Sequence, residues 1–324
     1  MGCASIARRL VIPAILSLPD RYELAAVASR DRGKAEEFAA AFATEAVTGY
    51  ENLLDREDIE AIYMPLPTGL HEEWVHKCLA AGKHVLAEKS LAIDHESARR
   101  MAGLAGSREL VLKENFMFKY HSQHNLTWKL LEEQQLGRLR LFRSQFGFPP
   151  MDRTNFRYDK SAGGGSLLDA GAYTVKASQW FLGHGLEVLD AVLYFDEVTG
   201  VDIYGNACLL SRRGIVAQIS FGFDNYYQCN YELWGSGGRL VAERAFTPKP
   251  AERPSMLVES PERRERVELE ADDHFKNILI SLYDNIRQGD FSSCLDEILD
   301  QSRVLTDIRD RAKHIRYESS GVRR

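Results

Sequence analysis

The chain has 324 residues, which predicts two domains or one large one. Apolar residues make up 44% and charged residues 27%, a globular balance that excludes collagen-like, disordered and coiled-coil chains. The net charge is −6 and no basic block is present, which argues against nucleic acid or an anionic membrane as a partner. Five scattered cysteines without C-x-x-C spacing fit a reducing cytoplasm and favour neither a disulfide scaffold nor a metal site.

No apolar run is long enough to cross a membrane. Arg8 and Arg9 precede the apolar stretch LVIPAILSL and so imitate a signal peptide. Residues 19–21 are Pro-Asp-Arg, where a cleavage site would need small side chains. We therefore expect a cytoplasmic protein.

The first third of the chain alternates short apolar runs with helical patterns. Strands are predicted at residues 22–29, 61–65, 83–89 and 111–116. Helices are predicted between them, at residues 31–43, 70–82 and 94–106. Strands that alternate with helices of about a dozen residues indicate βαβ units and a parallel sheet.

The pattern changes after about residue 118. Helices are predicted at residues 121–135 and 167–182, and two more at 274–288 and 295–314. Between them the chain contains successive extended runs, at residues 186–195, 204–212, 214–223, 227–235, 238–244, 255–260 and 266–271. Strands in succession with short breaks indicate an antiparallel or mixed sheet. We place the domain boundary at this change, between residues 118 and 119.

The N-terminal segment MGCASIARRLVIPAIL joins a glycine to a helical pattern. Gly2 and the small residues after it are similar to the turn into a dinucleotide-binding helix, where backbone N–H groups approach a pyrophosphate. A helix with an ordinary cap explains the pattern equally well. The strand that should precede such a turn is absent, and its loss would leave two unpaired ladders inside the sheet. We therefore expect that the start codon was assigned too late.

The second candidate feature is Ser29-Arg30, at the end of a predicted strand. An acidic residue there would bind the ribose of NAD, whereas a hydroxyl and a guanidinium suit the 2′-phosphate of NADP. Alternatively, Ser29 or Asp31 caps the next helix and Arg30 is solvated.

Two further strands end in residues that could carry chemistry. MPLPTGLH follows one strand, and its rigid Pro65-Leu66-Pro67 either walls a cofactor or forms a structural turn. His71 either contacts the cofactor or simply begins the next helix. Glu88-Lys89 ends the next strand. Burying a lysine there costs free energy unless its ammonium faces a cleft, where it could hold the ribose hydroxyls of a cofactor. Alternatively, the side chain lies at the rim of the sheet and extends its ammonium into solvent.

The richest stretch is GGGSLLDAGAY, residues 163–173. Three glycines permit a close backbone approach, and Asp169 and Tyr173 share a face of the following helix. Tyr173 could protonate a carbonyl, helped by a nearby ammonium that favours the phenolate. Alternatively, Tyr173 is a core residue and Asp169 its hydrogen-bond partner.

Several other polar residues could contact an anionic substrate, although each alone is equally typical of a solvated surface. They are Lys119, His121, His124, Arg157 and Tyr158. Tyr226, Tyr227 and Tyr231 could stack on a base or pack a half-exposed sheet.

These motifs together resemble a known family. Residues 47–91 and GGGSLLDAGAY are similar to the core of the glucose-fructose oxidoreductase / inositol dehydrogenase family. ENFMFKYHSQH, then FGFPP, then Arg157-Tyr158 before the glycines resemble a narrower branch, the NADPH-dependent ketoreductases of nucleotide-linked 3-ketosugars. The resemblance covers nearly the whole chain and keeps the order of the motifs.

The resemblance implies an α/β fold. A Rossmann-like parallel-sheet domain at residues 1–118, with its first strand missing, would bind the dinucleotide. An α+β domain at residues 119–324, with an open-faced and mainly antiparallel sheet, would bind substrate and form a homo-oligomer through that sheet. The family's Glu-Lys-Pro signature falls on Glu88, Lys89 and Ser90, and serine in place of proline removes a fixed φ. Lys176 stands where many members carry an aspartate.

The implied activity is reduction of the C3 keto group of a nucleotide-diphosphate-linked deoxyketosugar. Lys89 and Tyr173 would be catalytic, and Asp169, Arg157, Tyr158, Lys119 and His121 would bind substrate. NADP(H), rather than NAD(H), would lie against a larger set: Gly2, Cys3, Ala4, Ile6, Ser29, Arg30, Pro65, Leu66, Pro67, His71, Glu88, Lys89 and Asn115. No metal is expected. The alternatives are an NADP-dependent aldose or cyclitol dehydrogenase and a non-catalytic cofactor-sensing or scaffold protein.

Overall fold

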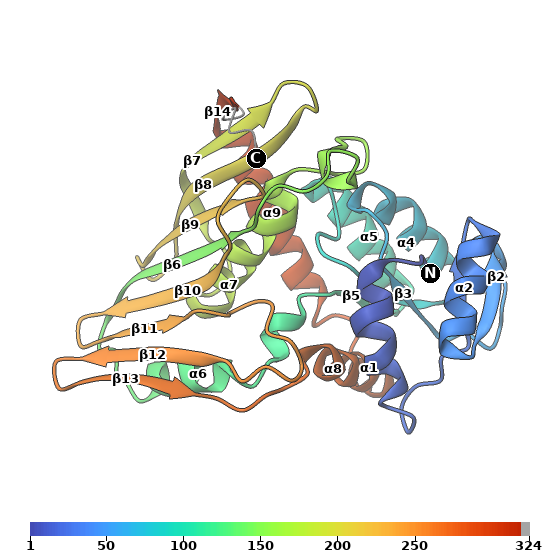
Figure 1. Ribbon diagram of the computed structural model, residues 1–324, viewed down its shortest axis with the longest axis horizontal. Helices are drawn as coiled ribbons and strands as arrows, with labels where there is room; N and C mark the ends of the chain where they lie inside the picture. Colours follow the sequence, from blue (N-terminus) through green and yellow to red (C-terminus); the bar gives the residue numbers. More distant parts are fainter. Residues whose placement is uncertain (319–324) are drawn as a thin grey trace. The chain divides into compact units, whose positions relative to one another are not determined.

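The computed structural model describes residues 1–318. Two compact units are present (Figure 1), the first built from Met1–His121 and Asp273–Leu299 and the second from Ser122–Asp272 and residues 300–318. The change of pattern near residue 118 places residues 273–299 in the second domain. In the structure they belong to the first unit, because the apolar face of the helix that begins at His274 packs there.

The first unit contains two small parallel sheets. One pairs β1 (Ala26–Ser29) with β2 (Glu45–Thr48). The other has the order β3 (Ala61–Met64), β4 (His84–Ala87) and β5 (Leu112–Glu114). Among the described residues no strand joins β1 to β3. This arrangement confirms the predicted Rossmann-like parallel fold and places the break where the first strand was expected.

Helices and turns connect these strands. They are η1 (Ala7–Val11) running into α1 (Ile12–Leu16), α2 (Arg32–Phe42), α3 (Glu51–Leu54), η2 (Thr68–Leu70), α4 (His71–Ala80), α5 (His95–Ser107), η3 (Met117–Tyr120) and α8 (His274–Gln288). Asp31 and Asp94 begin α2 and α5 by accepting hydrogen bonds from the backbone N–H groups of Lys34 and Ser97.

Helix α8 completes the core of the first unit. Its residues Ile278, Leu279 and Leu282 are buried. The Tyr22 hydroxyl donates a hydrogen bond of 2.6 Å to the Leu279 carbonyl, and the burial of that hydroxyl raises the pKa of Tyr22. On β5, the Lys113 ammonium donates to Ser281 Oγ at 2.8 Å. These contacts explain why α8 belongs to the first unit, although most residues of that unit are far from α8 in the sequence.

The second unit is built on a nine-stranded mixed sheet (Figure 1). Its order is β13-β12-β11-β10-β6-β9-β8-β7-β14, and only the pairs β6–β9 and β14–β7 are parallel. The strands are β6 (Leu139–Gly147), β7 (Glu187–Asp196), β8 (Val201–Leu210), β9 (Val216–Gly222), β10 (Gln228–Gly235), β11 (Arg239–Ala242), β12 (Ser255–Ser260), β13 (Arg263–Glu268) and β14 (Lys313–Arg316). The prediction of a mainly antiparallel sheet is thus confirmed.

One face of this sheet is covered and the other is open. Helix α7 (Ala172–Leu182), which continues η5 (Leu167–Gly171), packs on β6 and β9. Helix α6 (His124–Glu132) contacts α7 through the His124 and Trp180 rings, whose centroids are 5.1 Å apart. Tyr231 of β10 is wholly buried, and its hydroxyl lies 2.8 Å from His124 Nδ1. On the opposite face of the same strand Trp234 is 50% exposed. Alternating burial along the strands therefore produces the open face.

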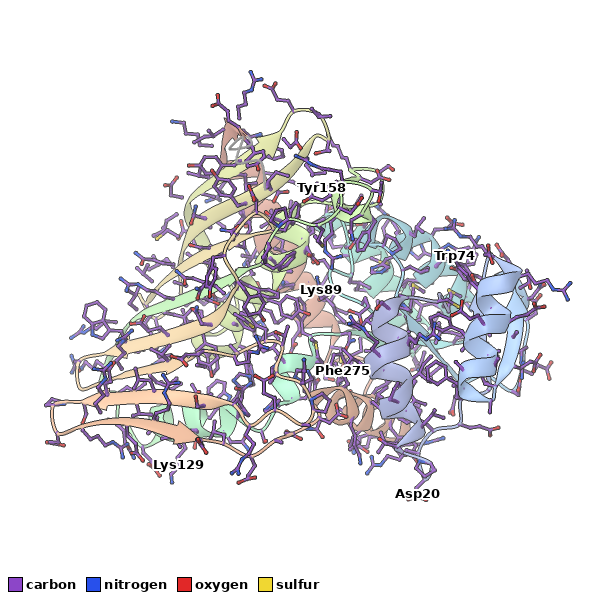
Figure 2. The ribbon with its side chains drawn as sticks, in the orientation of Figure 1. Asp20, Trp74, Lys89, Lys129, Tyr158 and Phe275 are labelled. Carbon is purple, nitrogen blue, oxygen red and sulfur yellow. The ribbon has the colours of Figure 1, made fainter. Side chains whose placement is uncertain are left out.

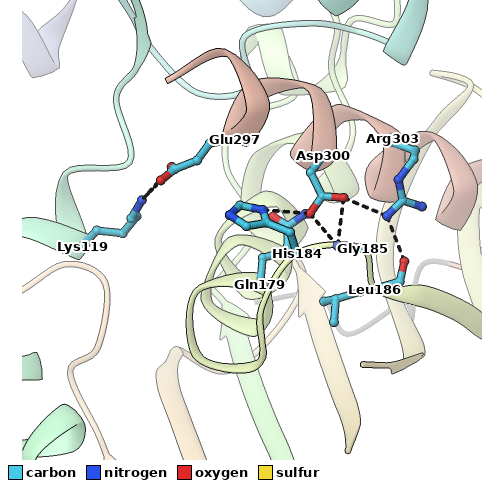
Figure 3. A network of polar contacts seen from close by, with 8 residues as sticks. All are labelled: Lys119, Gln179, His184, Gly185, Leu186, Glu297, Asp300 and Arg303. Carbon is cyan, nitrogen blue, oxygen red and sulfur yellow. Dashed lines mark hydrogen bonds and ion pairs between the residues drawn. The ribbon is translucent and has the colours of Figure 1, made fainter. Parts of the chain in front are cut away.

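Helix α9 (Leu295–Arg311) is tied to the end of α7 by Asp300 (Figure 3). The Asp300 carboxylate accepts hydrogen bonds from Gln179 Nε2 at 2.8 Å, the Gly185 N–H at 3.1 Å and Arg303 Nη2 at 2.8 Å. Burial alone raises the pKa of Asp300, but the bonds from Arg303 and Gly185 outweigh it, so the pKa lies below its usual range. Asp300 is therefore charged and fixes the C-terminal end of α7.

Candidate active site

The first candidate feature is the N-terminal turn at the carboxyl ends of β1 and β3. The Gly2 N–H donates to the Ala28 carbonyl at 2.8 Å, and the Met1 ammonium donates to the Tyr63 carbonyl at 2.9 Å. Gly2 has a φ of +95°, and a Cβ there would lie 2.9 Å from Leu66 Cδ2. The positive φ favours glycine at this position, and the chain then enters the helix at Ser5. The backbone N–H groups of that helix start are suited to a phosphate.

Ser29 and Arg30 follow β1 at the same edge. Ser29 is buried, and its Oγ accepts a hydrogen bond from the Asp31 N–H at 3.1 Å. Arg30 is exposed and lies within hydrogen-bonding range of the Tyr50 hydroxyl. Burial raises the pKa of Tyr50, while the Arg30 charge opposes that rise. Asp31 caps α2 and Arg30 is exposed, as the alternative interpretation expected. The contact of Ser29 and Arg30 with a 2′-phosphate stays a prediction.

Glu88 is a buried carboxylic acid between two neighbouring strands. Its Oε1 accepts hydrogen bonds from the Tyr63 hydroxyl at 2.7 Å and from Asn115 Nδ2 at 2.6 Å. Burial raises the pKa of Glu88, and the two donors oppose the rise. Glu88 and Asn115, both predicted to contact a cofactor, are thus joined directly, and Tyr63 is a member of this group that the sequence analysis did not single out.

Lys89 is half-buried at the carboxyl end of β4 (Figure 2). The peptide bond between Lys89 and Ser90 is cis, although serine replaces the proline of the family signature. The Leu91 N–H donates to Glu114 Oε1 at 2.8 Å, which ties the loop after Lys89 to β5. The loop that follows this lysine is therefore held against β5.

His71 connects the loops that follow β3 and β4. Its Nε2 lies 2.8 Å from the Leu66 carbonyl oxygen, and its Nδ1 lies 3.0 Å from that of Ser90 and 3.1 Å from that of Leu91. The ring is fully buried, and burial lowers the pKa of His71 against the opposing effect of the carbonyls. With both nitrogens against backbone carbonyls, His71 holds Pro65-Leu66-Pro67 and Lys89 together.

Lys119 and His121, predicted to bind substrate, have other partners in the first unit. The Lys119 ammonium pairs with both oxygens of Glu297, at 2.8 and 2.6 Å (Figure 3). His121 is buried and lies edge-on to the His274 ring, with ring centroids 5.6 Å apart. The geometry therefore gives both residues structural contacts within the first unit.

In the second unit the three glycines form a tight turn ahead of η5. Gly165 has a φ of +114°, and a Cβ there would overlap Asp202 Oδ1. The Asp202 carboxylate accepts hydrogen bonds from Ser166 Oγ and from the Leu167 N–H, each at 2.6 Å. Burial raises the pKa of Asp202, and these donors oppose it. Asp202 is a further site residue that the sequence analysis missed; the only signal was an acid within the apolar run of β8.

The same turn positions an ion pair. Arg157 Nε lies 2.5 Å from Asp169 Oδ2, and Arg157 Nη2 lies 3.2 Å from Asp169 Oδ1. Asp169 thus fixes Arg157, two residues that were predicted separately as substrate contacts. Tyr158 (Figure 2) is 6% exposed and lies edge-on to Phe223, with ring centroids 5.1 Å apart, which gives it a packing role.

Tyr173 begins α7 one turn beyond Asp169. Its ring lies edge-on to Phe146 at 5.0 Å between centroids and packs at 5.6 Å from Phe246. Only 5% of the residue is exposed, so its position is fixed by aromatic packing. A phenol held this way is suited to donate a proton to one defined point.

In residues 1–318 no group of three histidine, cysteine, aspartate or glutamate side chains could hold a metal ion. Over the same residues no helix has both the length and the apolar character that a membrane span requires.

Comparison with known proteins gives a consistent result. A model for an oxidoreductase family with an NAD-binding Rossmann fold matches residues 1–116, and one for the GFO/IDH/MocA C-terminal domain matches residues 126–241. A dTDP-3,4-didehydro-2,6-dideoxy-alpha-D-glucose 3-reductase from Saccharopolyspora spinosa is 44% identical over 89% of this chain and 87% of its own length. A D-xylose 1-dehydrogenase (NADP(+)) from Haloferax volcanii is 32% identical over 77% of this chain and 76% of its own.

A solved structure resembles nearly the whole chain. It is a 3-ketoreductase from Actinomadura kijaniata in complex with NADP and TDP-benzene, with a TM-score of 0.94 and 39% identity over 98% of each chain. Variants of that enzyme, one with a tyrosine changed to phenylalanine and others with a lysine changed to alanine or glutamate, were solved with the same two ligands. These relatives confirm the predicted resemblance to ketosugar reductases. The chain belongs to the GFO/IDH/MocA family of oxidoreductases.

Proposed function

We propose that this protein is an NADPH-dependent reductase that converts the C3 keto group of a nucleotide-diphosphate-linked deoxyketosugar into an alcohol. The observation that carries the proposal is the 44% identity to a dTDP-3,4-didehydro-2,6-dideoxy-alpha-D-glucose 3-reductase, which extends over both units. Lys89 and Tyr173, the proposed catalytic pair, each occupy a fixed position within their own unit.

The residues of the first unit fit NADPH. The helix start after Gly2 offers backbone N–H groups to a pyrophosphate, and Gly2 leaves room because it has no Cβ. The exposed guanidinium of Arg30 would pair with the 2′-phosphate, a group that NAD does not carry. Pro65, Leu66 and Pro67 would wall the cofactor, held in place by His71.

NADPH, when bound, supplies a hydride to the carbonyl carbon and leaves as NADP⁺. Tyr173 gives the proton of its hydroxyl to the carbonyl oxygen as negative charge develops there, so that the new C–H and O–H bonds make the alcohol. The Lys89 ammonium lowers the cost of the phenolate left on Tyr173 and orients the ribose hydroxyls. Solvent then restores the proton on Tyr173.

We assign Arg157 to the diphosphate of the substrate. A guanidinium matches phosphate geometry, and Asp169 fixes the side chain of Arg157 before substrate arrives. Because one edge of Arg157 is used by Asp169, a phosphate would be received by its remaining N–H groups. The other three residues have structural contacts. Lys119 pairs with Glu297, Tyr158 packs against Phe223, and His121 packs against His274.

A second candidate function is oxidation of a free aldose or cyclitol with NADP⁺. The similarity to a xylose dehydrogenase favours it, but that enzyme is only 32% identical over 77% of the chain. The 3-ketosugar reductase is 44% identical over 89% of the chain.

We also propose that the chain acts in the cytoplasm as a homo-oligomer formed through the open sheet face. Leu189 and Trp234 are each half exposed on that face. The five cysteines are unpaired, which fits a reducing compartment. Trp234→Glu should lower the sedimentation coefficient toward that of a monomer, while the matched change of the exposed Val198 should not.

The proposed activity is tested by following NADPH absorbance with a panel of substrates. We expect turnover with a dTDP-linked 3-ketosugar and none with xylose or inositol in either direction. Turnover of free sugars with NADP⁺ alone would favour the second candidate. NADPH binding, measured by fluorescence, without turnover of any sugar would favour a cofactor-sensing protein.

A further inference from the structure

Tyr173, the proposed proton donor, directly follows the end of a π turn. η5 occupies Leu167–Gly171 and α7 begins at Ala172, one residue before Tyr173. A π turn closes its hydrogen bonds one residue later than an α turn, so side chains beyond it are rotated about the helix axis relative to a continuous α-helix. Whatever fixes the end of η5 therefore fixes the direction of Tyr173.

The sheet holds η5 from one side. Asp202 of β8 accepts hydrogen bonds from Ser166 and from the Leu167 N–H, which fixes the start of the turn. At the end of the turn, a Cβ on Gly171 would lie only 3.1 Å from Phe221 of β9. The π turn is thus packed closely against the sheet at both of its ends.

Helix α9 holds the end of the π turn through Gln301. Gln301 Nε2 donates a hydrogen bond of 2.9 Å to the Ala172 carbonyl. The carbonyl before it, that of Gly171, accepts a hydrogen bond of 2.8 Å from Thr174 Oγ1. Gln301 is 1% exposed and Ala172 is fully buried, so water does not compete for this bond. Two consecutive carbonyls are therefore bound by side chains where η5 passes into α7.

Apolar packing alone does not explain an amide at position 301. Gln301 Oε1 is buried and accepts no hydrogen bond from any group in residues 1–318. A buried acceptor without a partner costs free energy that a leucine of similar size would avoid. Within the described part of the chain, the bond to Ala172 is what the amide provides in return.

We propose that Gln301 is a positioning residue, which directs the Tyr173 hydroxyl toward the keto oxygen by fixing the Ala172 carbonyl. This inference rests on the proposed reductase function. A displacement of about 1 Å, caused by a change far from the reacting atoms, can slow a reaction by about 100-fold. Arg157 and Asp169 are paired ahead of the end of the turn, so loss of the Gln301 bond leaves the substrate contact of Arg157 in place.

The test compares Gln301→Leu with a matched control, Gln179→Leu. Gln179 lies toward the other end of α7 and is 2% exposed. Its Nε2 donates one bond, to Asp300 at 2.8 Å (Figure 3), and its Oε1 also accepts none from the described residues. Each variant thus removes one buried amide and one hydrogen bond from α7, but only Gln301→Leu acts beside Tyr173.

Single-turnover NADPH oxidation with a dTDP-linked 3-ketosugar gives the first readout. Gln301→Leu should slow it by about 10–100-fold, with the KM for the ketosugar and the dissociation constant for NADPH unchanged. Gln179→Leu should stay near the parent rate. Equal rates in the two variants, or an effect confined to the KM, would overturn the proposal.

The second readout needs no turnover. 3-Fluorotyrosine placed at position 173 reports its surroundings by ¹⁹F NMR of the NADPH-bound protein. Gln301→Leu should move this signal and Gln179→Leu should not; a signal that Gln301→Leu leaves in place would overturn the proposal. A parent protein without turnover would contradict the proposed function, and the ¹⁹F signal would still decide the role of Gln301. Should Gln301→Leu not fold, Gln301→Met takes its place in both measurements.

Discussion

The turn before η5 makes a quantitative prediction about Gly165. Its φ of +114° is strained for any residue with a Cβ, at about 1–3 kcal/mol. A Cβ would also displace the Asp202 carboxylate, which accepts two hydrogen bonds of 2.6 Å from Ser166 and Leu167. Each such bond to a buried charged group contributes about 1–3 kcal/mol. If both bonds are lost, Gly165→Ala should therefore lower the free energy of unfolding by roughly 3–9 kcal/mol.

The matched control is Gly200→Ala in the same unit. Gly200 also has a positive φ, +68°, but a Cβ there would lie 3.7 Å from its nearest neighbour, Lys160 Cδ. Its cost should be about 1–2 kcal/mol, from the backbone alone. Urea unfolding curves of both variants measure the difference. If Gly165→Ala is no less stable than Gly200→Ala, the idea that Asp202 fixes the start of η5 fails. Should Gly165→Ala not fold, Asp202→Asn tests the same contact without a steric clash.

Two further predictions follow from buried and exposed charges. Since the folded pKa of Asp300 lies below its usual range, its stabilising effect is present above about pH 4, the unfolded value, and is lost as the pH falls through the folded value. Asp300→Asn should therefore be less stable than the parent at pH 7 and show a flatter loss of stability on acidification in urea titrations; an unchanged acid dependence would contradict this. Arg30→Glu should raise the KM for NADPH by about 10–100-fold and leave that for NADH nearly unchanged, which steady-state kinetics would show. Equal effects on both cofactors would remove Arg30 from 2′-phosphate recognition.

The elements with strong local signals could be predicted from sequence. Helix α8 was expected at residues 274–288 and lies at His274–Gln288, because Asp273 caps it and its apolar residues recur at helical spacing. The helix after the glycine turn was likewise expected at 167–182 and occupies η5 and α7. In both cases the start signal and the periodicity agree.

Elements with weaker signals were missed. β2, residues Glu45–Thr48, has one buried residue and no alternating apolar pattern, and parallel pairing with β1 alone makes it a strand. β6 and β14 were also not predicted, although β6 alternates between buried residues and exposed Arg143 and Gln145. β1 begins at Ala26 rather than at Tyr22, because Tyr22 turns toward α8.

Some residues of the site could likewise be predicted from local sequence signals, whereas others could not. Strand ends placed Ser29, Pro65 and Lys89 at one edge, since parallel strands share a carboxyl edge. Contacts between distant segments could not be read from spacing. The contacts of the His71 ring with three backbone carbonyls, and of Asp202 with the start of η5, join residues up to 36 positions apart.

The central claim is that Tyr173 delivers the proton during reduction of the keto group. Tyr173→Phe removes one oxygen atom and leaves the packing against Phe146 and Phe246 in place. Single-turnover NADPH oxidation with a dTDP-linked 3-ketosugar should slow by about 10²–10⁴-fold, with the dissociation constant for NADPH unchanged. Tyr158→Phe, the control within the same unit, should stay near the parent rate. An unaltered rate in Tyr173→Phe would contradict the account.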